Sequence, residues 1–319
     1  MPNVTFVNET LAAYSDYAFR TAVVIYLVAM VLHLGEYARD RVSSVAVPVA
    51  VGAPAPISQP AGDTGRAKRS RAERFGRTAV ALTILGAGLH VGSLALRGAA
   101  VLRWPWGNMY EFCSAICLVA VLGWLFVLRR TPAMRRVGAF VLLPVVVLLF
   151  LAGTVLYAQA APVMPALRSY WLAIHVTAAS ISGGLLLVAG VSSALFLVRV
   201  RAPRDATDGF VALLPTRDTL DRVAYRLTVI AFPIWTFAIM TGAIWAEAAW
   251  GRFWGRDPKE TVAFVAWVVY GGYLHARATA GWRNGGAAWV NVVGFAVMLF
   301  NLFFVNLVTA GLHSYAGVS

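Results

Sequence analysis

One segment, residues 243–261, combines tryptophan with fixed charges. Its aromatic residues are Trp245, Trp250, Phe253 and Trp254, and its charged residues are Glu247, Arg252, Arg256, Asp257, Lys259 and Glu260. Tryptophan alone is explained by its preference for the headgroup level of a membrane, but that preference does not explain the interleaved charges. Flat aromatic surfaces beside fixed charges suit a planar ligand with anionic edges, such as a porphyrin with two propionates. We therefore predict heme contacts from Trp245, Trp250, Phe253, Trp254, Arg252, Arg256, Asp257 and Lys259. The segment is expected to be a loop between two membrane spans, and Asp257-Pro258 fits the start of the next helix. For Asp257 and Glu260 a role in loop structure is favoured over proton transfer.

The histidines are the candidate iron ligands, and all five lie in or beside apolar runs: His33, His90, His175, His275 and His313. An ionisable residue in such a run is costly and is a functional candidate, and imidazole is a usual ligand of heme iron. His175 lies near one end of its run, and His313 directly follows the last run. We expect both at the membrane face that carries the tryptophan segment, where they could hold one iron from opposite sides.

The remaining histidines are separate cases. His275 lies 15 residues after Glu260, roughly 22 Å further along a helix, and could ligate a second heme inside the membrane. His33 lies at a similar depth and His90 in the other half of its run. Both are weaker candidates, because a lone membrane histidine is more often a hydrogen-bonded packing residue. No run holds two histidines, which disfavours a diheme cytochrome b bundle.

The composition predicts the elements that must position these residues. Of the 319 residues, 60% are apolar and 13% are charged, whereas soluble domains carry about 25% charged residues. A helix needs about 20 mainly apolar residues to cross a bilayer. The chain has eight uncharged runs, bracketed by charges at 20–36, 77–97, 111–129, 136–168, 168–199, 226–247 and 260–277 and beginning for the eighth after 283. We predict an all-α, polytopic bundle of about eight transmembrane helices, forming one domain over 1–319.

The net charge of +13 is explained by topology. Of the 27 Lys and Arg residues, 20 fall in or at the edges of the four loops on one side. Basic loops favour the cytoplasmic face, so both termini are expected outside, the tryptophan segment with them. Residues 39–75 are expected to form a flexible basic cytoplasmic loop in contact with membrane lipid. Nucleic-acid binding is not expected, and neither is a cleaved signal peptide, since no basic region precedes the first run.

Two cysteines, Cys113 and Cys117, are four residues apart in one apolar run. We expect packing residues without a disulfide there.

Three motifs together carry a resemblance to a known family. Residues 250–261, Trp-Gly-Arg-Phe-Trp-Gly-Arg-Asp-Pro-Lys-Glu-Thr, resemble the WWD signature of heme-handling membrane proteins. Their Asp-Pro-Lys-Glu-Thr ending looks like the CcsA (ResC) branch, called CcsB in some actinobacteria. Residues 106–112, Trp-Gly-Asn-Met-Tyr-Glu-Phe, and residues 273–277, Tyr-Leu-His-Ala-Arg, are similar to two further segments of that family. The resemblance covers roughly residues 76–315.

The resemblance implies a subunit of the System II cytochrome c synthase in a bacterial cell membrane. It implies that heme b, held by two histidines, is moved outward and attached through thioethers to the Cys-x-x-Cys-His motif of apocytochrome c. His175 and His313 then correspond to the outer ligands and His275 to a ligand of the transmembrane heme. The implied partners are a CcsB/ResB-type subunit, which supplies the other inner ligand, and a thioredoxin-like thiol reductant. His33 remains an in-chain rival for that ligand.

One residue departs from the family pattern. Arg256 stands where the family usually has tryptophan directly before the aspartate, and its guanidinium could pair with a propionate.

Two alternative functions stay open at this point. One is a heme exporter or chaperone of the CcmC-like type without synthase activity, and the other is a membrane subunit that binds no heme.

Overall fold

The computed structural model of the protein describes residues 7–45, 71–164, 167–202, 209–282 and 285–308. All regular elements in these ranges are helical. In chain order they are α1 (Glu9–Val45), α2 (Arg71–Val101), α3 (Met109–Arg130), the 3-10 helix η1 (Pro132–Val137), α4 (Gly138–Thr154), α5 (Tyr170–Arg201), α6 (Gly209–Ala212), α7 (Arg217–Trp250), α8 (Pro258–Thr279) and α9 (Gly285–Val308).

The predicted polytopic helical class is confirmed. Within the described ranges, seven segments are long and apolar enough to cross a membrane. The other long helix, α8, has 22 residues and measures about 33 Å. Its Lys259, Glu260 and Arg277 lower its hydropathy. The prediction of about eight helices therefore holds for length, although α8 is less apolar than the rest.

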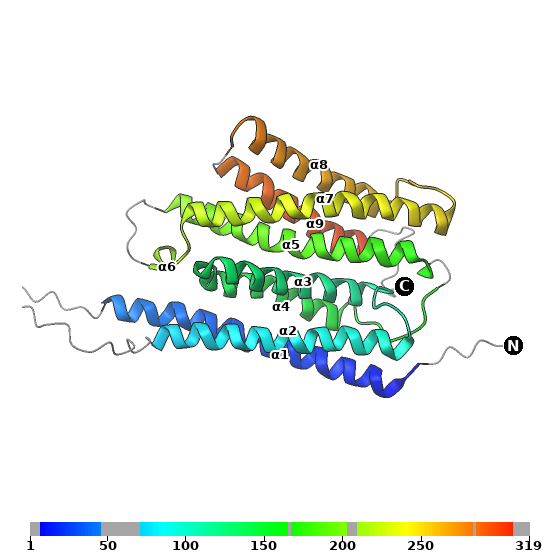
Figure 1. Ribbon diagram of the computed structural model, residues 1–319, viewed down its shortest axis with the longest axis horizontal. Coiled ribbons are helices and arrows are strands. Elements are labelled where there is room, and N and C mark those ends of the chain that lie inside the picture. Colours follow the sequence, from blue (N-terminus) through cyan, green and yellow to red (C-terminus); the bar gives the residue numbers. More distant parts are fainter. Residues whose placement is uncertain (1–6, 46–70, 165–166, 203–208, 283–284, 309–319) are drawn as a thin grey trace, which may run out of the picture.

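The long helices run roughly side by side and alternate in direction (Figure 1). The start of α1, the α7–α8 loop and the end of α9 consequently lie at one end of the bundle, which we call the tryptophan end. Helix α1 packs on α2, α5 packs on α7, α3 and α9, and α8 packs on α9 and α7. Helices α5, α7 and α9 thus surround the region beneath the α7–α8 loop.

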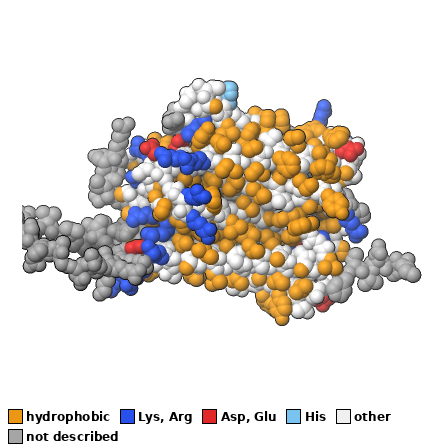
Figure 2. Space-filling view, in the orientation of Figure 1, with side chains coloured by type: hydrophobic (Ala, Val, Ile, Leu, Met, Phe, Trp, Pro, Cys, Tyr) orange, Lys and Arg blue, Asp and Glu red, His pale blue; other side chains and the backbone are white. Residues whose placement is uncertain are grey.

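Basic residues gather at the opposite end of the bundle, which we call the basic end. Figure 2 shows Lys and Arg clustered at this end, while hydrophobic side chains cover the middle of the visible face. Many of the large apolar side chains on the helices are exposed, including Phe126, Phe150 and Phe237. Exposed apolar residues around the middle and charged residues at one end are what a membrane-embedded bundle requires.

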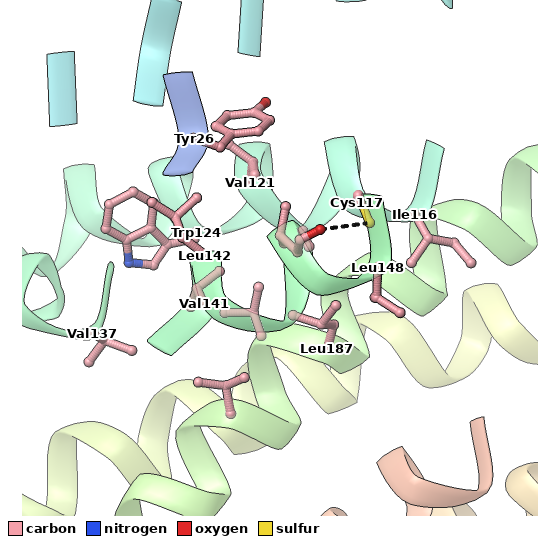
Figure 3. Close-up of a cluster of buried hydrophobic side chains, with 14 of the residues drawn as sticks. Tyr26, Ile116, Cys117, Val121, Trp124, Val137, Val141, Leu142, Leu148 and Leu187 are labelled. Carbon is pink, nitrogen blue, oxygen red and sulfur yellow. Dashed lines mark hydrogen bonds between the residues drawn. The ribbon is translucent and has the colours of Figure 1, made fainter. Parts of the chain in front are cut away.

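The main core lies between α1, α3, α4 and α5. Cys113 and Cys117 are both free and fully buried there, and the thiol of Cys117 donates to the carbonyl of Val145 at 3.8 Å (Figure 3). Both cysteines are therefore packing residues, as predicted.

Helices extend into both ends of the expected loop 39–75. Helix α1 continues to Val45 and α2 begins at Arg71, and residues 46–70 lie outside the described ranges. Charged residues mark where a helix leaves the hydrocarbon region, but a helix can continue into water because Arg is a good helix former.

Candidate functional site

The tryptophan segment is mostly helical, contrary to its expected form as a loop. Helix α7 continues to Trp250 and ends at Gly251, whose φ of 70° is left-handed and whose N–H donates to the Glu247 carbonyl at 2.8 Å. Helix α8 begins after Asp257, whose carboxylate accepts from the Lys259 N–H at 2.9 Å. The helix-start signal of Asp257-Pro258 is thus confirmed, and only residues 251–257 form a loop. The apolar pattern of α7 runs past Glu247, so a single charge did not end the helix.

Internal contacts hold this loop in shape. The side chain of Glu260 accepts from the Gly255 N–H at 2.9 Å. The guanidinium of Arg252 lies where a side chain at position 255 would start, so a larger residue there would require Arg252 to move. Arg256 has φ 57°, a left-handed conformation that is uncommon for residues other than glycine. Asp257 and Glu260 therefore shape the loop, which is the role expected for them.

His175 on α5 faces α7. Its Nδ1 lies 2.7 Å from the carbonyl oxygen of Ala238. A carbonyl can only accept, so Nδ1 carries the proton and the lone pair lies on Nε2. Metal-binding histidines typically donate their second ring nitrogen in this way, which fixes the orientation of the ring. The indole of Trp245 lies nearly parallel to the imidazole, with ring centroids 6.1 Å apart and planes at 12°.

A large apolar cavity opens beside His175. It is partly open, and apolar side chains make up most of its lining. Five of the predicted residues line it: His175, Trp245, Phe253, Trp254 and Lys259. Ala243 and Glu260 of the same segment also line it.

The other predicted contacts lie around the cavity. Trp250 packs edge-on against Trp245 with ring centroids 4.8 Å apart. Arg252 and Arg256 lie in the loop, Arg256 exposed to solvent, and Asp257 caps α8. Contact of Arg252 and Arg256 with heme at the rim of the cavity therefore remains a prediction. Asp257 has a structural role.

Several cavity residues escaped the sequence analysis. Phe112 from α3, Trp235 from α7 and Phe295 and Met298 from α9 complete the walls. They lie far apart in the chain and look like ordinary apolar helix residues, so only helix packing brings them together. Gly242 on α7, which makes room for the imidazole, did carry a signal: glycine inside an apolar helix often marks a close approach.

Lys259 places a cation in the cavity wall. Its Nζ lies 3.4 Å from the Met109 sulfur and 5.9 Å from the centre of the Phe112 ring. The Asn301 amide on α9 donates to the Lys259 carbonyl at 3.4 Å, which ties the start of α8 to α9. A cation in an apolar wall is suited to an anionic group on a bound ligand.

Among the described histidines, His33, His90 and His275 do not line this cavity. His90 is fully buried, with Nε2 2.7 Å from the Ser114 hydroxyl and Nδ1 3.4 Å from the Tyr26 hydroxyl. It is a hydrogen-bonded packing residue. His33 is also buried and meets the Trp124 ring edge-on at 5.5 Å.

His275 is exposed on the surface of α8. It lies along the helix from Lys259 toward the basic end, at the depth expected for it. His313 lies outside the described residues.

The motif at residues 106–112 is held by a buried carboxylate. Glu111 is fully buried and pairs with Arg97 at 2.8 Å and Arg103 at 2.8 Å. It also accepts from the Gly107 N–H at 2.7 Å, while Asn108 caps α3 by accepting from the Glu111 N–H at 2.9 Å. This motif therefore fixes the chain at the start of α3.

A second charged group ties this corner to α1. Asp16 on α1 lies 3.6 Å from Arg97 and accepts from the Tyr157 hydroxyl at 2.5 Å. Burial, with the Asp16 carboxylate beside it, raises the pKa of Tyr157. The first helix is thereby joined to α2, α3 and the chain after α4 at the tryptophan end.

The motif at residues 273–277 has a mainly structural role. Tyr273 is buried, and Arg277 forms a two-pronged pair with Asp221 on α7 at 2.5 and 3.0 Å. These contacts fasten α8 to α7 at the basic end, while His275 between them stays on the outer face.

The cavity fits a heme on three counts. Its aromatic walls suit a flat macrocycle, His175 offers an oriented ring nitrogen, and Lys259 offers a positive charge. Neutral imidazole on one wall and a second histidine would complete a six-coordinate iron.

Comparison with known proteins agrees with this geometry. Residues 106–313 match the family described as Cytochrome C assembly protein. The Cytochrome c biogenesis protein CcsA of the green alga Chlamydomonas reinhardtii is 41% identical over 49% of this chain and 44% of its own length. CcsA of Synechococcus sp. strain CC9902 is 35% identical over 70% of this chain and 84% of its own length. CcsA of Synechococcus elongatus is 33% identical over 72% and 86%. The family match spans more than half of the chain, and the chain therefore belongs to the cytochrome c assembly protein family.

Proposed function

We propose that this protein serves cytochrome c biogenesis as the transmembrane subunit of a System II cytochrome c synthase. In this role it holds heme b at the tryptophan end and positions it for thioether attachment to apocytochrome c. The observation that carries the proposal is His175: an imidazole oriented by the Ala238 carbonyl, stacked on Trp245, at the wall of the aromatic cavity.

The second axial ligand in this proposal is His313. His313 lies outside the described residues, and the resemblance of the chain to the family is what supports this assignment. His275 is the proposed ligand for a heme inside the membrane. Its exposure on α8 supports an inner site completed by a CcsB/ResB-type partner subunit.

The chemistry of attachment asks little of the protein's own side chains. Each substrate thiol adds across one heme vinyl group, with sulfur bonding to one carbon and the proton ending on the other. This addition is redox-neutral, although the thiols must first be kept reduced by a thioredoxin-like reductant. The protein's contribution is to hold heme and peptide in register, which makes the addition effectively intramolecular.

The membrane and its orientation complete the proposal. The basic end faces the cytoplasm of a bacterial cell by the positive-inside rule, and the tryptophan end faces outward. Heme then reaches the same side as the secreted apocytochrome. Lipid contacts the exposed apolar middle of the bundle.

The test is an absorption spectrum of the protein purified with its partner subunit. We expect a bis-histidine heme signal in the wild type that falls several-fold in His175→Gly and in His313→Gly. Imidazole added to His175→Gly should restore the signal, because the small molecule can fill the space beside Gly242. His90→Gln, which keeps hydrogen-bonding capacity away from the cavity, is the matched control and should retain heme.

Three other outcomes would change the conclusion. Wild-type protein without heme, when heme and the partner are supplied, would contradict the proposal. Heme bound at His175 without cytochrome c production would favour an exporter or chaperone. Loss of heme in His90→Gln equal to that in His175→Gly, without imidazole rescue, would show that the histidine substitutions act through folding.

A further inference from the structure

Two further spaces lie between His175 and the surface at the tryptophan end. Behind the His175–Trp245 pair lies a smaller cavity with about 520 Å³ of empty space, which reaches Trp106, Asn108 and Met109 at the start of α3. A surface cleft with about 860 Å³ of empty space lies beyond it, between the α2–α3 and α4–α5 connections. We call these the inner pocket and the outer cleft.

The three spaces are neighbours that share wall residues. The large cavity and the inner pocket share four wall residues: Phe112, His175, Trp245 and Lys259. The inner pocket and the outer cleft share four others: Trp106, Gly107, Leu167 and Leu172. His175 therefore lies between a large apolar cavity and a series of spaces leading to the tryptophan-end surface.

Buried charges hold the walls of the outer cleft in place. Glu111 accepts from the Gly107 N–H and from Arg103. Arg103 reaches across the cleft and donates to the Ala161 carbonyl from Nε at 3.1 Å and from Nη2 at 3.0 Å. The α2–α3 connection is thus clamped to the α4–α5 connection. A clamped groove binds a flexible segment at a lower entropic cost.

The clamped walls present large apolar side chains to solvent. Leu102 is 82% exposed and has φ 51°, Trp104 is 71% exposed, and Tyr170 is 90% exposed. The left-handed conformation of Leu102 ends α2, with the Arg103 N–H donating back to the Gly98 carbonyl at 3.1 Å, and it leaves the Leu102 side chain pointing outward. Rigid exposed aromatic residues are typical of binding surfaces, where they give large contact areas with little loss of side-chain freedom.

We propose that the outer cleft binds the segment of apocytochrome c that carries the Cys-x-x-Cys-His motif, and that the inner pocket guides this segment to His175. This proposal rests on the function proposed above. The large cavity then receives heme from the membrane side, while the peptide arrives from the aqueous side. The two reactants meet at the wall formed by His175 and Trp245.

Membrane lipid is the competing occupant of exposed aromatic residues at this level. Two features favour a peptide. The cleft continues inward to the candidate heme ligand, which a lipid has no reason to approach. In addition, Arg103 holds two loops together across the cleft. Tryptophans of an interfacial aromatic belt lie on helices and need no such support.

Disulfide trapping tests the proposal, because both native cysteines are buried and new surface thiols are the accessible ones. Trp104→Cys and Tyr170→Cys introduce thiols into the cleft. Tyr14→Cys is the matched control, at a 56% exposed aromatic residue on α1 near the same end and outside the cleft. Each full-length variant is produced with its partner subunit and an apocytochrome c, and diamide serves as the oxidant.

We expect both cleft variants to form a mixed disulfide with the substrate at least tenfold more than Tyr14→Cys. The adduct should disappear when the substrate cysteines are replaced by serine. In a second measurement, the double variant Trp104→Ala/Tyr170→Ala should lower holocytochrome c yield at least fivefold and leave heme occupancy at the wild-type level.

The outcomes separate this inference from the proposed function. Equal trapping at Tyr14, or wild-type yield in the double alanine variant with no cleft adduct, would overturn the inference while leaving heme handling intact. A wild-type protein that neither holds heme nor supports attachment would overturn both. Heme loss in the double alanine variant would place its aromatic residues in the heme site and would also contradict the inference.

Discussion

Gly242 on α7 lies directly against the imidazole of His175 on α5. A methyl group added to this glycine would come within 2.7 Å of the ring atoms Cε1 and Nδ1. The hydrogen bond from His175 to the Ala238 carbonyl runs one helical turn away on the same face of α7. The absence of a side chain at position 242 is therefore what allows the ring to adopt its orientation.

Gly242→Ala should displace the imidazole and reduce heme occupancy several-fold. Overpacking of this kind also costs about 1–3 kcal/mol of stability. Gly272→Ala on α8 is the matched control, because a methyl group there meets nothing within 4 Å. Heme absorbance per protein checks the prediction, and equal occupancy in the two variants would contradict it.

Arg256→Gly isolates the charge of Arg256 from its backbone conformation. Glycine adopts a φ near 57° without strain, so this variant removes the guanidinium and keeps the loop. If Arg256 pairs with a propionate, heme should bind about tenfold more weakly, consistent with the roughly 1.5–3 kcal/mol of a charged hydrogen bond. Heme titration measures the effect, and Arg256→Lys should recover part of it. Unchanged affinity in Arg256→Gly would remove this residue from the site.

Asp257→Ala should loosen the start of α8. Loss of a helix N-cap costs about 1 kcal/mol, and here the loop 251–257 depends on it. Asp257→Asn keeps the accepting oxygen and should behave like the wild type. Thermal unfolding in detergent and protease sensitivity of the loop distinguish the two variants. A wild-type unfolding temperature in Asp257→Ala would show that the loop is held by Glu260 and Arg252 alone.

Glu111→Gln should be strongly destabilising. It leaves Arg97, which is 1% exposed, beside a neutral amide, and breaking a buried pair costs about 3–5 kcal/mol. Glu73→Gln, in an exposed pair with Arg77 on one helix turn, should cost no more than about 0.5 kcal/mol. Chemical denaturation of the two variants compares them. Similar stability would mean that water replaces the lost carboxylate at the tryptophan end.

The sequence predicted the helices well because crossing a membrane imposes a strong constraint on composition. It predicted helix ends less well. Trp245 and Trp250 appeared to lie in a loop, yet both belong to α7, because the helix simply continues past the level at which charges appear. The N-cap at Asp257 was predicted correctly because its signal is local.

The site was harder to predict because the histidines are chemically identical and differ only in the residues around them. His90 meets two hydroxyl groups, His175 meets a carbonyl and an indole, and His275 meets no core at all. Those neighbours come from other helices, so packing rather than local pattern decides which histidine faces a cavity. The contribution of α9 through Phe295 and Met298 was invisible for the same reason.

The two buried cysteines have a consequence for chemical selectivity. A protein that presents electrophilic vinyl groups to incoming thiols would be at risk of alkylating itself if it carried a reactive thiol within reach. Cys113 and Cys117 are enclosed in the α3–α4 packing, on a different part of the bundle from the α7–α8 loop. Under the proposed function, burial of both thiols would keep the protein from being alkylated by heme and from entering disulfide exchange with the substrate.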